Sequence, residues 1–251
     1  MSDTHSGHPH ADCPQPRERR SRLSISGLGL SISGVGLGMA TALWAYAVYA
    51  APVDHSQGLI QKILYVHVPC WFAAYAGFGL TALCGALYLW RDDERFDRVA
   101  VAGAEVGVLF CTLGLVSGPI WAKGTWGHWW AWDPRLTATL VLWFIYLAYL
   151  LLRSLTEGSA RIARFAAVYG IAGLVAVPLN YFAIELFGGA AMHPDNLERG
   201  SLGAGMGWPF AMGVVAGLIA FVHLVLLRVD LERRRISASP LEADWGQDGD
   251  F

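Results

Sequence analysis

The chain has 251 residues, of which 55% are hydrophobic and only 15% are charged. This composition excludes an ordinary soluble domain and indicates an integral membrane protein. The formal net charge of −2 says little by itself, because the distribution of charge across the membrane carries the information, and no nucleic acid is expected among the partners.

The chain opens with a polar segment, residues 1–22, that is rich in histidine and proline. We expect a disordered cytoplasmic tail, since too few apolar residues are present to form a core. His5, His8, His10 and Cys13 could bind a metal, but their spacing fits no closed zinc site. The apolar run that follows is too long for the core of a cleavable signal peptide.

Six apolar segments follow, and each approaches the roughly 20 residues that a helix needs to cross the hydrocarbon core. They are approximately Leu28–Ala51, Ile63–Trp90, Val99–Trp121, Leu136–Leu152, Ile162–Leu186 and Met206–Leu227. The sequence therefore predicts an all-α integral membrane protein, a bundle of six transmembrane helices within one domain, residues 23–230. Residues 231–251 form a second cytoplasmic tail, which is acidic and mobile from residue 236.

The basic residues predict the orientation, because cytoplasmic loops carry an excess of arginine and lysine. Arginines gather in residues 17–22, 91–98, 153–164 and 228–235. The opposite side carries only Lys62, Lys123, Arg135 and Arg199. Both termini are therefore expected in the cytoplasm, and the loop between the third and fourth segments on the outer, periplasmic face.

Glycines four residues apart predict where helices pack closely, since small residues let backbones approach. The pairs are Gly34/Gly38, Gly103/Gly107 and Gly213/Gly217. This pattern concerns packing only.

Two absences in the sequence narrow the function. The four cysteines form no CxxC or CxxCH motif, which argues against a dithiol oxidoreductase and a c-type cytochrome. Neither lysine, Lys62 or Lys123, completes a P-loop. Any use of ATP must then come from a partner, and the chain is expected not to be an enzyme.

The segment WGHWWAWDPRLT, residues 126–137, is the most informative part of the chain. Its four tryptophans are Trp126, Trp129, Trp130 and Trp132. Such a loop can anchor in the lipid–water interface or stack against a large planar ligand. Asp133 is expected to cap the fourth helix, because Pro134 then falls at its first position.

Two histidines are candidate iron ligands on the outer side. His67 lies in YVHVPCW, with Trp71 on the same helix face and Pro69 between them. His193 lies in the last outer loop, in AAMHPDN. Taken singly, each can be a structural or solvated histidine, but two imidazoles facing an aromatic wall can hold haem by both axial positions.

Other residues at this side have weaker claims to a role. Met192 is a possible ligand, whereas His128 is favoured as a loop residue and His223 as a packing residue. Arg135, Lys123 and Arg199 could pair with the anionic propionates of haem. Arg135 could equally form a salt bridge or cap the fourth helix. Glu185 could neighbour the site, and Glu105 could be reached by arginines of the adjacent cytoplasmic loop.

The string WGxWWxWDxRLT, with HVP in the preceding helix, closely resembles the haem exporter protein C family of bacterial cytochrome c maturation, within the tryptophan-rich WWD class. The resemblance covers approximately Leu28 to Leu227. It implies non-covalent binding of haem b, with His67 in HVP matching the first axial histidine of the family. His193 is placed as the second axial ligand of the iron from its position in the last outer loop. The resemblance also implies that Trp126, Trp129, Trp130, Trp132 and Asp133 form the haem platform, to which we add Trp71 and Arg135.

The resemblance further implies a heme transport role in the bacterial inner membrane, with a periplasmic haem chaperone as recipient. The implied partners are an ATP-binding subunit, a second membrane subunit and a small single-helix subunit, besides membrane lipid. Two alternatives stay open. One is a haem–thioether ligase, as in longer relatives, and the other is a structural membrane subunit with an interfacial tryptophan belt.

Overall fold

The computed structural model describes residues 17–155, 159–188 and 202–245, with side chains described from residue 34 to residue 236 within these ranges. This part of the chain is all-helical, as predicted. The helices are α1 (Arg17–Ala50), η1 (Leu59–Ile63), α2 (Leu64–Arg91), α3 (Glu94–Trp126), α4 (Pro134–Ser154), α5 (Ala160–Gly173), α6 (Ala176–Tyr181), α7 (Ala183–Phe187) and α8 (Gly207–Trp245).

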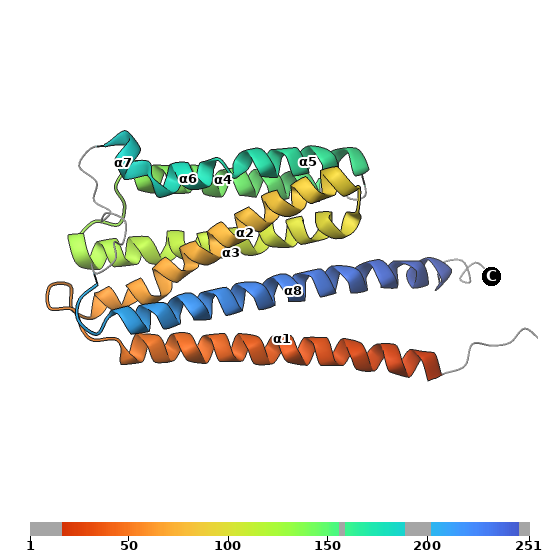
Figure 1. Ribbon diagram of the computed structural model, residues 1–251, viewed down its shortest axis with the longest axis horizontal. Helices are drawn as coiled ribbons and strands as arrows, with labels where there is room; N and C mark the ends of the chain where they lie inside the picture. The colour runs from red at the N-terminus through yellow and green to blue at the C-terminus, as the bar shows by residue number, and fades with distance from the viewer. Residues whose placement is uncertain (1–16, 156–158, 189–201, 246–251) are drawn as a thin grey trace, which may run out of the picture.

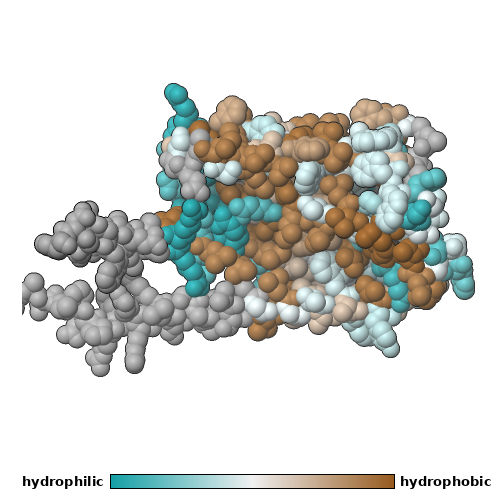
Figure 2. All heavy atoms as spheres, turned by 180° about the vertical axis from the view of Figure 1, so that it is seen from behind, coloured by the Kyte–Doolittle hydropathy of each residue, from teal (hydrophilic) through white to brown (hydrophobic). Residues whose placement is uncertain are grey.

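Five helical stretches in the described ranges are long and apolar enough to span a membrane. They are Leu59–Arg91, Glu94–Trp126, Pro134–Ser154, Ala160–Tyr181 and Gly207–Ile236. A brown, hydrophobic surface covers the middle of the face in Figure 2, and hydrophilic residues gather toward its two ends. The membrane class is thus confirmed. Helix α1 contributes a shorter apolar stretch, Gly34–Ala50, so the sixth span remains a prediction.

Helix α2 is the centre of the bundle, since it packs against α1, α3, α5 and α8. Helices α1 and α8 lie together on one side, and α4 to α7 lie on the other (Figure 1). We call the end with residues 51–58 and 127–133 the tryptophan end. The opposite end, with the turn at residues 92–93 and the start of α1, is the arginine end (Figure 1).

Glycine brings α2 and α3 into backbone contact, as the spacing of Gly103 and Gly107 predicted. A Cβ atom on Gly77 would lie 2.7 Å from the carbonyl oxygen of Gly103 and 2.7 Å from Cα of Gly107. The pair Gly34/Gly38 was predicted to do the same for α1, but neither residue has a described atom within 4 Å of its Cβ position. In α1 it is Gly36 that makes room, for the ring of His223.

A proline in α2 sets the approach of α8. Pro69 has no N–H, so the carbonyl of Tyr65 four residues earlier is released from the helical ladder. Gly213 packs at this point, where a Cβ atom would lie 2.5 Å from the carbonyl oxygen of Tyr65. The predicted pair Gly213/Gly217 is therefore confirmed as a close contact.

The fifth apolar segment was predicted as one helix, Ile162–Leu186, but it is divided into α5, α6 and α7. Pro178 is the physical reason for the first break, between α5 and α6, because it cannot donate to the carbonyl of Leu174. The N–H of Val177 takes that carbonyl instead, at 3.0 Å, in a tighter i→i+3 turn. The break leaves α6 as a separate short helix beside α4.

The predicted tails also differ from the structure. Helix α1 already begins at Arg17, inside the segment expected to be disordered, and α8 continues to Trp245, beyond the expected start of the C-terminal tail. Ion pairs one turn apart support this extension of α8. Arg228 and Glu232 are 2.9 Å apart, and Arg234 and Asp230 are 2.7 Å apart. The remaining tail residues lie outside the described ranges.

Candidate functional site

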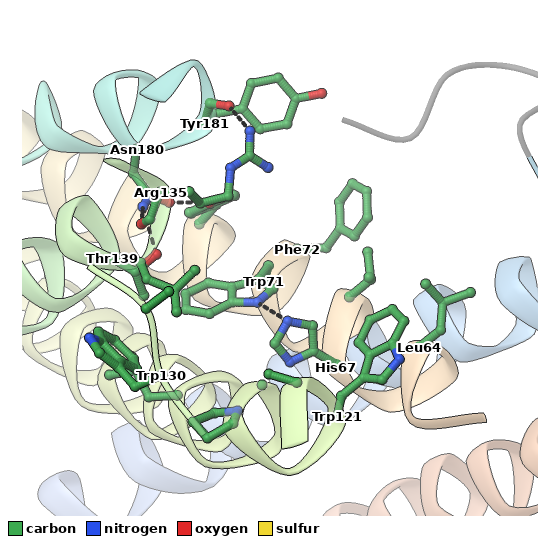
Figure 3. Close-up of a pocket in the computed structure, with 18 of the residues that line it drawn as sticks. Leu64, His67, Trp71, Phe72, Trp121, Trp130, Arg135, Thr139, Asn180 and Tyr181 are labelled. Atoms are coloured by element: carbon green, nitrogen blue, oxygen red, sulfur yellow. Dashed lines mark hydrogen bonds between the residues drawn. The ribbon is translucent and has the colours of Figure 1, made fainter. Parts of the chain in front are cut away.

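A cavity of about 320 Å³ opens at the tryptophan end between α2, α3, α4 and α6. Its volume is at the lower end of the roughly 300–1,000 Å³ of typical ligand pockets. The residues that carry its chemistry are His67, Trp71, Tyr75, Trp121, Trp126, Trp130, Arg135, Thr139, Asn180 and Tyr181. Figure 3 labels all of these except Tyr75 and Trp126. Aromatic rings, four of them indoles, form a large part of its wall, and His67 is the single histidine among the described lining residues.

His67 is buried, and both of its ring nitrogens are engaged. Ser117 donates its hydroxyl proton to the carbonyl of Leu113 at 2.7 Å, so its oxygen accepts from Nδ1–H of His67 at 2.9 Å. The indole Nε1–H of Trp71 donates to Nε2 of His67 at 3.1 Å (Figure 3). An indole N–H can only donate, so Nε2 carries the lone pair. His67 is thus a neutral imidazole whose lone pair lies on Nε2.

The face of α3 opposite His67 is built from small residues. A Cβ atom on Gly118 would lie 3.1 Å from Cε1 of His67, and one on Gly114 would lie 2.5 Å from Cζ2 of Trp71. A side chain at residue 114 would overlap the indole of Trp71, and one at residue 118 would press on the imidazole of His67, so these glycines give both rings room. The predicted shared face of His67 and Trp71 is confirmed, since their rings meet edge to face with centroids 5.9 Å apart.

Trp121 supplies a second ring beside the imidazole. Its centroid lies 5.8 Å from that of His67, again edge to face, and its indole N–H donates to Oε1 of Gln57 at 2.8 Å. In the view of Figure 3, His67 lies between Trp71 and Trp121. The two tryptophans differ in their hydrogen bonds: only the N–H of Trp71 points at Nε2 of His67.

Polar groups gather at the other end of the cavity, around α6. The buried amide of Asn180 donates to the hydroxyl oxygen of Thr139 at 2.8 Å and accepts from the hydroxyl of Tyr75. Arg135 donates from Nη2 to the carbonyl of Tyr181 at 2.8 Å, and this nitrogen lies 4.0 Å from Glu185. One cationic group and several neutral polar groups therefore face an otherwise apolar space.

The structure divides the four predicted platform tryptophans into two pairs. Trp126 and Trp130 line the cavity, and the indole nitrogen of Trp130 is buried without a hydrogen-bond partner among the described residues. Trp129 and Trp132 are 59% and 76% exposed on the surface of the same end. Trp132 still contacts Trp130, with ring centroids 5.7 Å apart.

Asp133 has a structural position. Its carboxylate accepts from the backbone N–H of Leu136 at 2.8 Å, and Pro134 is the first residue of α4, so the predicted cap is confirmed. Gly127 ends α3 with φ of 79°, a conformation that favours glycine. Together these two residues fix the short loop that carries Trp129, Trp130 and Trp132.

The remaining candidates are spread over the molecule. His193, Met192 and Arg199 lie outside the described residues, and His128 is exposed in the tryptophan loop. Lys123 donates to the carbonyl of Gly127 at 2.9 Å. His223 is a packing residue, as expected, with Nδ1 2.8 Å from the carbonyl oxygen of Ile219. Glu105 pairs with Arg228 of α8, rather than with the loop arginines that the sequence indicated.

Three residues of the site were not predicted: Trp121 and Asn180, which line the cavity, and Ser117, which bonds to His67 from behind it. Trp121 and Ser117 lie one turn apart near the end of α3, and Asn180 lies within the fifth apolar segment. An amide inside an apolar segment is itself a signal for a functional or structural site. That signal could have identified Asn180. Ser117 had none, because serine is common in membrane helices.

Comparison with known proteins gives a consistent result. The model of a family described as Heme exporter protein C matches residues 21–242. Heme exporter protein C of Haemophilus influenzae is 34% identical over 194 residues, which cover 76% of this chain and 77% of that protein. The corresponding protein of Bradyrhizobium diazoefficiens is 32% identical over 201 residues, covering 78% and 76%. That of Escherichia coli K12 is 29% identical over 210 residues, covering 80% and 84%.

Proposed function

The chain belongs to the haem exporter protein C family, and from that premise we propose that it binds haem b non-covalently in the cavity at the tryptophan end. His67 is the proposed axial ligand of the iron. One observation supports this above all others: a buried neutral imidazole presents its Nε2 lone pair inside an aromatic cavity. A neutral imidazole nitrogen is the form that ligates iron.

The described residues fit the chemistry of haem. Flat indole rings of Trp71, Trp121 and Trp130 can cover an apolar porphyrin and exclude water from it. The guanidinium of Arg135 is suited to a propionate, because it binds carboxylates in a fork. The buried indole N–H of Trp130 offers a further donor. His193 is the proposed second axial ligand, and it lies outside the described residues.

We place this end at the periplasmic side of the bacterial inner membrane, since arginines concentrate at the other end. Residues 23–230 are then the haem-handling domain between two cytoplasmic tails, 1–22 and 231–251. Trp129 and Trp132 are exposed at this end and can sit in the lipid–water interface. The loop would thus combine the two roles that the sequence left open, with one pair of tryptophans for each.

The proposed role is the export and delivery of haem for the maturation of c-type cytochromes. The cavity holds haem with one edge accessible, and a periplasmic haem chaperone takes it from there. The chain has no P-loop, so ATP hydrolysis would belong to an ATP-binding subunit. That subunit acts in a complex with a second membrane subunit and a small single-helix subunit. Within this complex the chain is a binding and transfer subunit rather than an enzyme.

Absorption spectra of the purified protein test haem binding by His67. The wild type should show a six-coordinate low-spin haem, and His67→Ala should lose most of it. His128→Ala is the matched control, because this histidine is exposed at the same end but lies outside the cavity lining. Equal haem content in wild type and His67→Ala would refute the proposal. A wild type that takes up no supplied haem would favour the structural subunit, with Trp129 and Trp132 as its interfacial belt.

A further inference from the structure

The ligand atom of His67 already has a partner in the haem-free protein. Nε2 accepts the indole N–H of Trp71 at 3.1 Å, and the same lone pair is the one that would bind iron. A lone pair cannot serve both partners at once. If His67 binds haem, as proposed above, the Trp71–His67 hydrogen bond must break when the iron–nitrogen bond forms, and it can form again when haem leaves.

We propose that Trp71 is a competitor for the ligand atom of His67, which lowers the retention of haem and so favours its release to the next carrier. This inference rests on the proposed function. It assigns Trp71 a role beyond a wall of the cavity. The indole N–H satisfies Nε2 in the haem-free state, so departure of haem leaves no buried acceptor without a partner.

The surroundings of Trp71 allow this exchange. Trp71 is half-buried and lines the cavity, so its indole has open space on one side. Its other edge rests on Gly114. The imidazole, by contrast, is held in place by Ser117 through Nδ1, on the side away from Nε2. The tryptophan can therefore turn away while the histidine keeps its orientation.

The chain offers a matched pair of variants. Trp71→Phe removes the N–H at the ligand atom but keeps an aromatic ring. Trp121→Phe makes the same change of indole to phenyl at nearly the same distance from His67. The N–H that it removes donates to Gln57 and not to His67. The difference between the two variants therefore isolates the Trp71–His67 hydrogen bond from the general effect of losing an indole.

The first readout uses the haem-free protein. Diethyl pyrocarbonate modifies imidazole through a free nitrogen lone pair, and mass spectrometry reports the modified fraction of His67. We expect Trp71→Phe to be modified roughly two- to tenfold faster than Trp121→Phe, a range that corresponds to the net free energy of one hydrogen bond. Equal modification rates would overturn the inference, whether or not haem binds.

The second readout is the rate at which haem passes from the loaded protein to excess apomyoglobin. Trp71→Phe should release haem roughly two- to tenfold more slowly than Trp121→Phe, for the same reason. Equal or faster release from Trp71→Phe would contradict competition and assign Trp71 to stacking alone. Failure of the wild type and both variants to take up haem at all would instead refute the proposed function.

A second variant guards against misfolding of Trp71→Phe. In Gly114→Ala the added methyl group would lie 2.5 Å from Cζ2 of Trp71, so the indole must shift although its N–H is retained. It should therefore change the modification rate of His67 in the same direction. No change in this variant, in a protein that elutes as the wild type does, would count against the inference.

Discussion

At the scale of single residues, the reactivity of the site depends on one chain of donors and acceptors. The Leu113 carbonyl accepts from Ser117, Ser117 accepts from Nδ1–H of His67, and Nε2 of His67 accepts from Trp71. Each step forces the next, because indole can only donate and the serine proton is already committed. The neutral ligand form of His67 is thus a consequence of its neighbours.

Ser117→Ala tests the orienting end of this chain. Without its acceptor, the imidazole loses its fixed orientation and part of its basicity, and loss of such a partner typically lowers metal affinity about 10- to 100-fold. We expect haem affinity to fall within that range and the midpoint potential of bound haem to rise. Titration with haem and redox titration measure these effects. Ser117→Thr keeps the hydroxyl and should restore both values, and failure to do so would contradict the assigned role.

Sequence alone identified His67 and Trp71 because a helical spacing of four places them on one face. It could not identify Ser117 or Trp121, since their contact with His67 arises from the packing of α2 on α3. It also grouped four tryptophans as one platform, although the turn after Gly127 exposes Trp129 and Trp132 and turns only Trp130 inward. A contact between two residues of one helix can be predicted from their spacing in the sequence, whereas a contact between two helices can be predicted only when their packing is known.

At the scale of helices, the crossing of α2 and α3 supports the site, because it brings His67 and Ser117 together. Gly77→Ala should destabilise the protein, since its Cβ would lie 2.7 Å from backbone atoms of α3. Overpacking of this kind costs about 1–3 kcal/mol. Thermal unfolding in detergent measures it. Gly79→Ala on the same helix has no neighbour within 4 Å and is the control, so an equal loss of stability in both would be inconsistent with the crossing.

The amide of Asn180 holds the short helix α6 to α2 and α4 after the break at residues 174–175. Asn180→Leu leaves Tyr75 and Thr139 without their partner, and a buried unsatisfied group costs about 1–3 kcal/mol. Thermal unfolding should show this loss. Adding Thr139→Val and Tyr75→Phe should recover part of it, because the stranded polar groups are then gone. Additive losses in the triple variant would argue against a shared network.

Helix existence was predictable and helix ends were not. The length of the apolar runs was enough to locate the segments, because the thickness of the hydrocarbon core sets the number of apolar residues that a spanning helix needs. The break in the fifth segment depends on one proline, and the extension of α8 depends on ion pairs at helical spacing beyond the apolar part. Both are local effects that a count of apolar residues does not register.

At the scale of the whole molecule, the account requires the tryptophan end to face the periplasm. In a cysteine-free background, His55→Cys at that end should react with a membrane-impermeant maleimide in spheroplasts. Glu94→Cys at the arginine end should react only after the membrane is opened. Both positions are exposed, so accessibility within the protein does not decide the result. Labelling in the opposite pattern would reverse the orientation.

The central claim is that Nε2 of His67 ligates haem iron in this cavity. The most direct test is to replace His67 by glycine and to supply imidazole to the haem-loaded protein. The account predicts that His67→Gly has an altered or absent low-spin spectrum, and that added imidazole restores the wild-type spectrum by occupying the space of the lost ring. A His67→Gly protein whose haem spectrum matches the wild type without imidazole would contradict the claim.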